Sequence, residues 1–149
     1  MENLKLNNQI CFPIYSASRL ITKAYKPFLD EMEVTYPQYL VLLVLWEKDG
    51  VSINHISKQL ILNTNTLSPL LKRMEKMELI ERNRSVEDER SVIIQLTEKG
   101  KELKAKATSI PEKLIEIMLS EKINLNKIIE MKEMLNDLIN ILSKSNKPE

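Results

Sequence analysis

ILNTNTLSPLLKRMEKMELIERNRSVEDERSVIIQLTEKG, residues 61–100, contains the change of period that decides the fold. Its first part is a turn followed by a helix, because the apolar residues after Thr64 recur on one stripe at helical spacing. These residues are Leu67, Leu70, Leu71, Met74 and Met77. After Leu79 the period becomes that of strands, and ERNRS and SVIIQL flank the polar loop VEDER as an antiparallel hairpin. Upstream, VSINHISKQL predicts a short extended piece and a short helix carrying Ile56 and Leu60.

Helix, turn, helix and hairpin in this order predict a winged helix-turn-helix, which places one helix in a DNA major groove. The preceding TYPQ is a helix start: Thr35 caps, Pro37 sits just inside the helix, and Gln38 completes a capping box. YLVLLVLW (39–46) is apolar nearly all round, so we expect this helix to be central and buried until a turn at Asp49-Gly50.

Further helices are expected at both ends of the chain. A helical pattern covers about residues 7–32, with Pro13 in the first turn and Pro27 bending the helix or ending it early. Thr97 is expected to cap a long amphipathic helix that breaks at Pro111, and a last helix spans about 125–142. The predicted fold class is therefore mainly α with a small β-hairpin, in which terminal helices flank the winged part.

Composition limits the possible functions. A chain of 149 residues buries one sizeable core, so we expect a single domain over 1–149. No secretion signal is visible and the longest apolar run is too short to cross a membrane, which favours a cytoplasmic protein. One cysteine excludes an internal disulfide, and with only one histidine (His55) we expect no metal site and no cofactor. With 22 basic and 21 acidic residues, DNA binding requires that charge be segregated by face.

The polar side of the helix at 64–76 has the chemistry of a DNA-reading face. Asn65, Thr66 and Ser68 can reach base edges or phosphates, and Lys72 and Arg73 can neutralise phosphates. In the hairpin, the basic strand residues are Arg82 and Arg84, and the tip offers Arg90, which is suited to a narrow minor groove. The alternative is an ordinary surface helix, which also carries one polar face.

Cys11 is the one nucleophilic sulfur of the chain. A lone cysteine is usually a small buried hydrophobe. Here, however, it lies near a predicted helix N-terminus, whose dipole stabilises a thiolate, and Tyr15 lies one turn away on the same face. These features support a sensing role, and simple packing remains the alternative.

Residues 61–100 resemble the recognition helix and wing of the MarR (multiple antibiotic resistance regulator) family of DNA-binding regulators. The D-x-R of the wing corresponds to Asp88-Glu89-Arg90, and L-T-x-x-G corresponds to residues 96–100. QICFPIY and YKPFLDEMEVTYPQYLVLLVLWE are similar to the one-cysteine organic hydroperoxide resistance regulators (OhrR). The resemblance implies a homodimer on a pseudo-palindromic DNA operator. In that arrangement the winged lobe spans about 36–100, the dimerisation helices span about 7–32 and 101–143, and Asp88 orients Arg90.

The resemblance also implies a redox function. Cys11 matches the peroxide-sensing cysteine, and Tyr15, Tyr25 and Tyr36 match the tyrosines around it, some of them contributed by the second subunit. The expected function is transcription repression relieved when an organic hydroperoxide oxidises Cys11, after which a low-molecular-weight thiol forms a mixed disulfide.

Three alternatives remain open: a repressor released by a small ligand, a thiol peroxidase, which lacks a resolving cysteine, and a protein–protein adaptor. Departures from the family pattern are Pro13, Asn63, Asn65 and Glu78. Because Glu78 replaces a glycine, we expect the exit of the recognition helix to differ.

Overall fold

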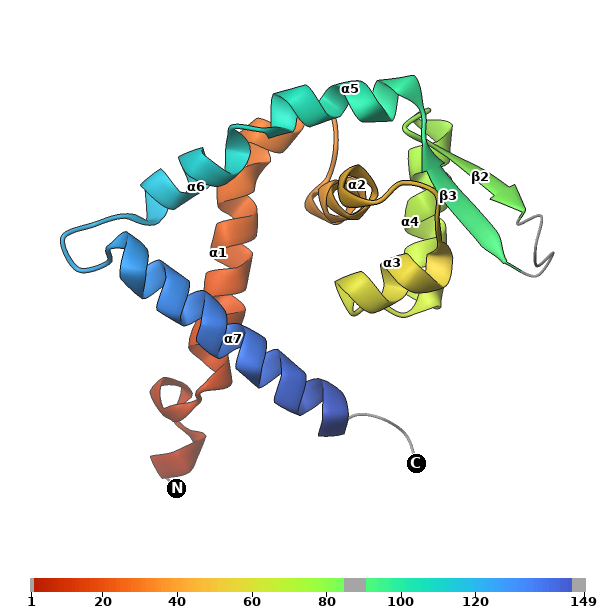
Figure 1. Ribbon diagram of the computed structural model, residues 1–149. Helices are drawn as coiled ribbons and strands as arrows, with labels where there is room; N and C mark the ends of the chain where they lie inside the picture. The colour runs from red at the N-terminus through yellow and green to blue at the C-terminus, as the bar shows by residue number, and fades with distance from the viewer. Residues whose placement is uncertain (1, 85–90, 146–149) are drawn as a thin grey trace. The chain divides into compact units, whose positions relative to one another are not determined.

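The computed structural model describes residues 2–84 and 91–145, and over these ranges helices dominate (Figure 1). Two single-turn 3-10 helices, η1 (Glu2–Leu4) and η2 (Leu6–Asn8), precede the first long helix. The elements that follow are α1 (Cys11–Asp30), α2 (Tyr36–Glu47), β1 (Val51–Ser52), α3 (Ile53–Leu60), α4 (Thr64–Lys76), β2 (Ile80–Arg84), β3 (Val92–Leu96), α5 (Glu98–Ala107), α6 (Ile110–Met118) and α7 (Leu125–Ser145). No helix in these ranges combines the length and apolar character needed to cross a bilayer.

The chain divides into two compact units, Met1–Ile110 and Pro111–Glu149. In the first unit α2 is the central element, because it contacts α1, α3, α4 and α5. Its capping box between Thr35 and Gln38 is present, and Tyr39, Leu42 and Leu45 are buried in the core. The prediction of a buried central helix is confirmed.

The second unit contains most of α6 and all of α7. Its α7 exposes a series of large apolar side chains, including Leu125, Ile129, Met134, Leu135, Leu138, Ile139 and Leu142. Apolar residues at this density on one helix are characteristic of a surface that another polypeptide covers.

The hairpin of the sequence analysis is part of a three-stranded antiparallel sheet in the order β1-β3-β2. Sequence reasoning recognised β2 and β3 but not the pairing of β1, whose Val51 lies opposite Ile94. The Asp49 carboxylate stabilises the β1 edge of the sheet. Its Oδ1 accepts hydrogen bonds from the backbone N–H groups of Gly50 and Leu96, each at 2.9 Å. Gly50 adopts φ +69°, which glycine tolerates without strain.

Three helices end on a residue with left-handed backbone that is not glycine: Glu33, Ile61 and Glu78. After α4, Glu78 N–H donates to Glu75 O at 2.9 Å and Leu79 N–H donates to Met74 O at 3.0 Å. These are the two hydrogen bonds of a Schellman motif. The expectation that Glu78 would alter the exit of this helix is therefore wrong, because the hydrogen bonds hold a glutamate in the conformation that glycine usually takes.

One expectation for the first helix also needs correction. The helix begins at Cys11 rather than near residue 7, because residues 6–8 form the separate turn η2, in which Gln9 N–H donates to Leu6 O. Of the two effects expected at Pro27, an early end of the helix does not occur, since α1 continues to Asp30. The predicted break at Pro111 is confirmed, with α5 ending at Ala107 and α6 beginning at Ile110.

Candidate functional site

The candidate reading helix α4 begins with a side-chain cap. Asn63 Oδ1 accepts the backbone N–H of Thr66 at 3.1 Å and its hydroxyl at 3.0 Å. Thr66, predicted to reach DNA, therefore uses its hydroxyl proton in the cap. Leu67, Leu70, Leu71 and Met74 are buried, so the helix orientation in the fold is fixed by one apolar face.

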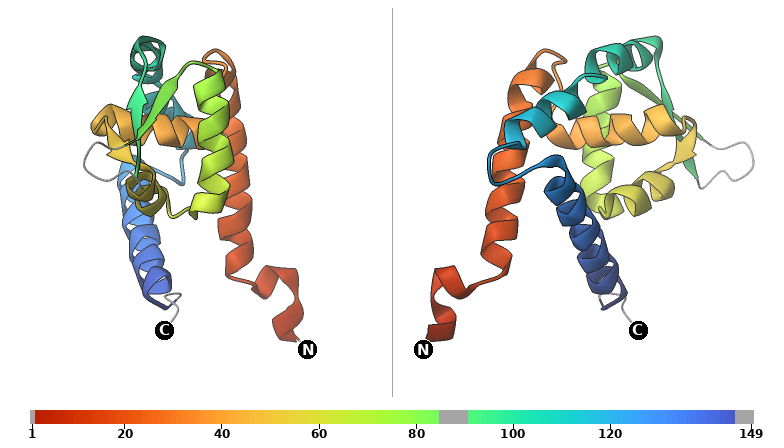
Figure 2. Two further views of the ribbon diagram at one scale, coloured as in Figure 1. Left: turned by 90° about the vertical axis from the view of Figure 1, so that its right-hand side faces the viewer. Right: turned by 60° about the vertical axis from the view of Figure 1, so that its left-hand side comes forward.

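The opposite side of α4 is exposed and basic. Asn65, Lys72, Arg73 and Lys76 are exposed there. The left view of Figure 2 shows α4 along its length beside the sheet. Ser68 is half-buried and faces a hollow of about 200 Å³, which it shares with Ser52, Thr64 and Val92. The nearly neutral chain thus concentrates cations on the face of one helix, which is the segregation that DNA binding requires.

Of the remaining predicted DNA residues, the sheet carries Arg84. Arg84 is exposed at the end of β2. Asp88 and Arg90 lie outside the described residues, so their predicted roles remain predictions.

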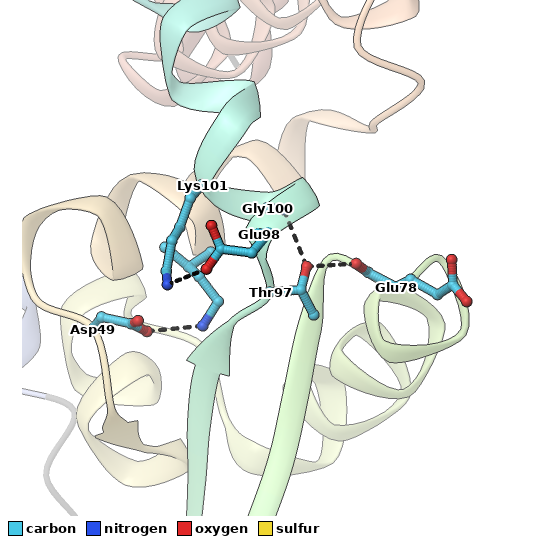
Figure 3. A network of polar contacts seen from close by, with 7 residues as sticks. Asp49, Glu78, Thr97, Glu98, Gly100 and Lys101 are labelled. Carbon is cyan, nitrogen blue, oxygen red and sulfur yellow. Dashed lines mark hydrogen bonds and ion pairs between the residues drawn. The ribbon is translucent and has the colours of Figure 1, made fainter.

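A polar junction fastens the C-terminal end of α4 to the start of α5 (Figure 3). Thr97 Oγ1 donates to Glu78 O at 2.6 Å and accepts Gly100 N–H at 3.1 Å. From the other side, Trp46 Nε1 donates to Gly100 O at 2.9 Å. A Cβ on Gly100 would lie 2.1 Å from Leu79 O, so only glycine fits here. The sequence prediction that Thr97 caps this helix is confirmed. Sequence reasoning used Gly100 only as part of a family motif and missed its close packing against Leu79, although the motif itself was the available signal.

Cys11 and Tyr15 occupy the N-terminal end of α1. The thiol is exposed in the first turn, and Pro13 stands in the same turn, as predicted. Tyr15 is 59% exposed, and its oxygen accepts a hydrogen bond from Arg19 Nη1 at 3.4 Å. The guanidinium carbon of Arg19 also lies 5.5 Å from the centre of the Tyr15 ring.

Tyr25 and Tyr36 lie in a different place, within a cluster of aromatic rings. Their ring centroids are 4.9 Å apart, and Tyr39 lies 5.8 Å from Tyr25 and 6.2 Å from Trp46. Burial, and then the neighbouring phenols of Tyr36 and Tyr39, raise the pKa of Tyr25 to about 12. Burial likewise raises the pKa of Tyr36 and of Tyr39. These phenols therefore keep their protons, and their capacity to donate hydrogen bonds, throughout the physiological range.

The four predicted sensing residues form two separate pairs within one chain. Tyr25 lies fourteen residues after Cys11 on the same helix, which corresponds to roughly 21 Å along the axis. One protomer therefore cannot bring its own Cys11 to its own Tyr25.

A hollow of about 530 Å³ lies along α1 beside Tyr36. Arg19, Lys23 and Lys26 contribute to its wall, and Lys26 forms an ion pair with Asp30 at 2.7 Å. The described residues contain no cluster of three or more histidine, cysteine, aspartate or glutamate side chains suited to a metal ion.

Comparison with known proteins gives consistent relatives. The family model described as "Transcriptional regulator SarA/Rot" matches residues 23–107. The chain is 54% identical over 110 residues to the organic hydroperoxide resistance transcriptional regulator of Bacillus subtilis (strain 168), covering 74% of this chain and 75% of that protein. It is also 34% identical over 135 residues to the HTH-type transcriptional regulator MgrA of Staphylococcus aureus, covering 90% of each chain.

Among solved structures, reduced AbfR bound to DNA has a TM-score of 0.80 and 34% identity to this chain, and the match covers 99% of each chain. AbfR is a protein of Staphylococcus epidermidis. Overoxidised AbfR bound to DNA gives 36% identity, 96% coverage of each chain and a TM-score of 0.75. AbfR has also been solved in a disulfide form.

Proposed function

This chain belongs to the MarR/SarA-type family of winged-helix transcriptional regulators, and we propose that it is a repressor that leaves its DNA operator when an organic hydroperoxide oxidises Cys11. The observation that carries the redox part is the exposed thiol in the first turn of α1, in a chain with no other cysteine. The relatives are regulators rather than enzymes, and AbfR is known in reduced, overoxidised and disulfide forms.

On the DNA side, the lobe of about residues 36–100 presents α4 to a major groove. Lys72 and Arg73 neutralise phosphates, and Asn65 and Ser68 reach base edges or the sugar–phosphate backbone. The helices of about 7–32 and 101–143 form a homodimer, whose apolar contacts include the exposed face of α7. A two-fold dimer presents two copies of α4 to the two halves of a pseudo-palindromic site.

On the sensing side, Cys11 and Tyr15 come from one subunit, and Tyr25 and Tyr36 come from its partner. The separation of Cys11 from Tyr25 along α1 supports this division, because one copy cannot bring these two residues together. The raised pKa values of the two half-buried phenols support their role as hydrogen-bond donors to the thiolate.

The chemistry follows from the single thiol. The Cys11 thiolate attacks the terminal oxygen of the hydroperoxide, the O–O bond breaks, and the sulfur transfers two electrons. The products are Cys11 sulfenic acid and the alcohol of the peroxide. A low-molecular-weight thiol then displaces the hydroxyl as water and leaves a mixed disulfide. The added group separates the thiol from the phenols, and the two DNA lobes lose the spacing that matches the operator.

A gel-shift experiment on the DNA upstream of the protein's own gene tests this function. The reactions contain wild type or Cys11→Ser, with and without cumene hydroperoxide, and cysteine as the small thiol. The thiol is included because overoxidised AbfR has been solved bound to DNA, so overoxidation of Cys11 alone would not distinguish the outcomes. We expect peroxide to release wild type but not Cys11→Ser. Release of both proteins, or of neither, contradicts the redox function.

The hollow beside Tyr36 favours a second candidate function. Its cationic wall suits a small phenolic or carboxylate ligand that releases the repressor while Cys11 remains passive. Cys11→Ser would then respond to effector as wild type does. Repeated turnover of hydroperoxide with a thiol reductant would instead indicate a peroxidase.

A further inference from the structure

Arg82 faces the protein interior, although it lies in the basic hairpin. It is paired with Ile94 on β3, and residues directly opposite each other in an antiparallel sheet point to the same face. That face is the core face, because Ile94 is fully buried. The Arg82 side chain is only 21% exposed, and its Nε is buried without a hydrogen-bond partner among the described residues. Arg82 is therefore less available to a phosphate than an exposed arginine is.

The charge of Arg82 is directed at the reading helix. Its Nη1 lies 3.7 Å from Oε2 of Glu75, which is on the last turn of α4 and 44% exposed. Glu75 follows the buried Leu71 by four residues, so it lies on the flank of α4 beside the sheet rather than on the outer reading face. Arg84, two residues further along β2, is exposed and therefore free of this enclosure.

We propose that Arg82 is a positioning residue that fixes the angle between α4 and the β2–β3 hairpin through its ion pair with Glu75. The pair joins the two elements that must enter neighbouring grooves at the same time. Arg82 itself does not touch a phosphate. The proposal rests on the proposed DNA-binding function, whereas it is independent of the redox chemistry of Cys11.

The sign of one substitution separates positioning from direct electrostatics. Glu75 is an anion close to a DNA-binding face, so its repulsion of the phosphates opposes binding, and removal of that charge alone should strengthen the complex. If Glu75 instead holds Arg82 and the hairpin in place, Glu75→Gln weakens the complex. Glu81→Gln is the matched control, because Glu81 is exposed on the other face of β2 and carries the same charge.

The experiment measures the dissociation constant of the full-length dimer for its upstream DNA at several salt concentrations. We expect Glu75→Gln and Arg82→Met each to weaken binding roughly threefold to thirtyfold, and the double variant to be no weaker than the weaker single variant. The slope of log K against log salt should stay that of wild type in both, since each variant still neutralises the same phosphates. In Arg84→Met, by contrast, the slope should decrease by about 0.9 for each phosphate that Arg84 neutralises.

Four results would overturn the proposal. They are tighter or unchanged binding by Glu75→Gln, unchanged binding by Arg82→Met, additive effects in the double variant, and a reduced salt slope in Arg82→Met. Urea midpoints and circular dichroism of each variant identify a folding defect, and Arg82→Lys, which retains the charge, should recover part of the affinity. If wild type itself shows no salt-sensitive binding to the DNA, the proposed function fails, and that outcome is distinct from a failure of the Arg82–Glu75 assignment.

Discussion

Replacing Gly100 by alanine tests the junction between the reading helix and α5. Helix propensity alone predicts stabilisation by up to about 1 kcal/mol, because alanine is the better helix former. The structure predicts the opposite, because the new Cβ would lie 2.1 Å from Leu79 O and 3.0 Å from Leu96 Cδ2. The two arguments therefore predict changes of opposite sign in the free energy of unfolding.

The size of the effect follows from the obstructing atom. Leu79 O is a backbone oxygen that accepts Thr97 N–H at 3.2 Å, and it would have to retreat by roughly 1 Å to relieve the clash. Overpacking of this kind costs about 1–3 kcal/mol. Since the obstacle is backbone rather than a flexible side chain, we expect the free energy of unfolding to fall by about 3 kcal/mol, together with weaker DNA binding.

Urea unfolding at one fixed protein concentration measures this decrease, because the stability of a dimer depends on concentration. Fluorescence of Trp46, whose indole N–H bonds Gly100 O, reports the junction, and far-ultraviolet circular dichroism reports the helices. The matched control is Ala105→Gly, the reverse exchange at an exposed position of α5, with an expected cost of about 1 kcal/mol. The reasoning is refuted if Gly100→Ala is as stable as wild type or more stable.

Three further outcomes are expected. Ile61→Gly should raise the free energy of unfolding by about 1 kcal/mol in urea titrations, since a β-branched, 63% exposed residue there adopts φ +53°; a decrease would mean that the side chain contributes more than the backbone strain. The pKa of Tyr25 is about 12 in the folded state, above its unfolded value of 10.0, so the stability that its neutral phenol contributes is complete below pH 10 and is lost as the pH rises toward 12. Tyr25→Phe should therefore make the alkaline decline in the free energy of unfolding shallower. An unchanged decline would contradict the raised pKa of Tyr25. Lys72→Ala should reduce the salt slope of DNA binding by about 0.9 for each phosphate that Lys72 neutralises, whereas an unchanged slope removes Lys72 from the interface.

Most of the fold could be predicted from the sequence because local signals agree with the tertiary structure. The capping box at Thr35, the apolar stripe of α4 and the change to a strand period after Leu79 each appear where they were expected. The strand β1 was not predicted as part of the sheet, since two residues carry no periodicity and the pairing depends on Asp49, far away in sequence from Leu96. The exit at Glu78 was misjudged, because residue preference was given more weight than the two backbone hydrogen bonds that close the turn.

The sequence predicted candidate site residues but not how they are arranged in space. Helical spacing placed Cys11 and Tyr15 about one turn apart on one helix, and the structure has both near the N-terminal end of α1. The enclosure of Arg82 could not be inferred from composition, since Arg82 and Arg84 have the same chemistry and differ only in what covers them. The contribution of Tyr39 and Trp46 to one aromatic cluster with Tyr25 and Tyr36 likewise depends on how α1 crosses α2.

The left-handed residues at the ends of three helices have an evolutionary consequence. Where two main-chain hydrogen bonds close the C-terminal turn of a helix, glycine is helpful at the left-handed position but not obligatory. The side chains of Glu33, Ile61 and Glu78 at these positions cost only a modest amount of stability. The residue type at such a position can therefore change in evolution without a change in the backbone conformation. A motif search that requires glycine at these helix ends would miss homologues that have the same fold.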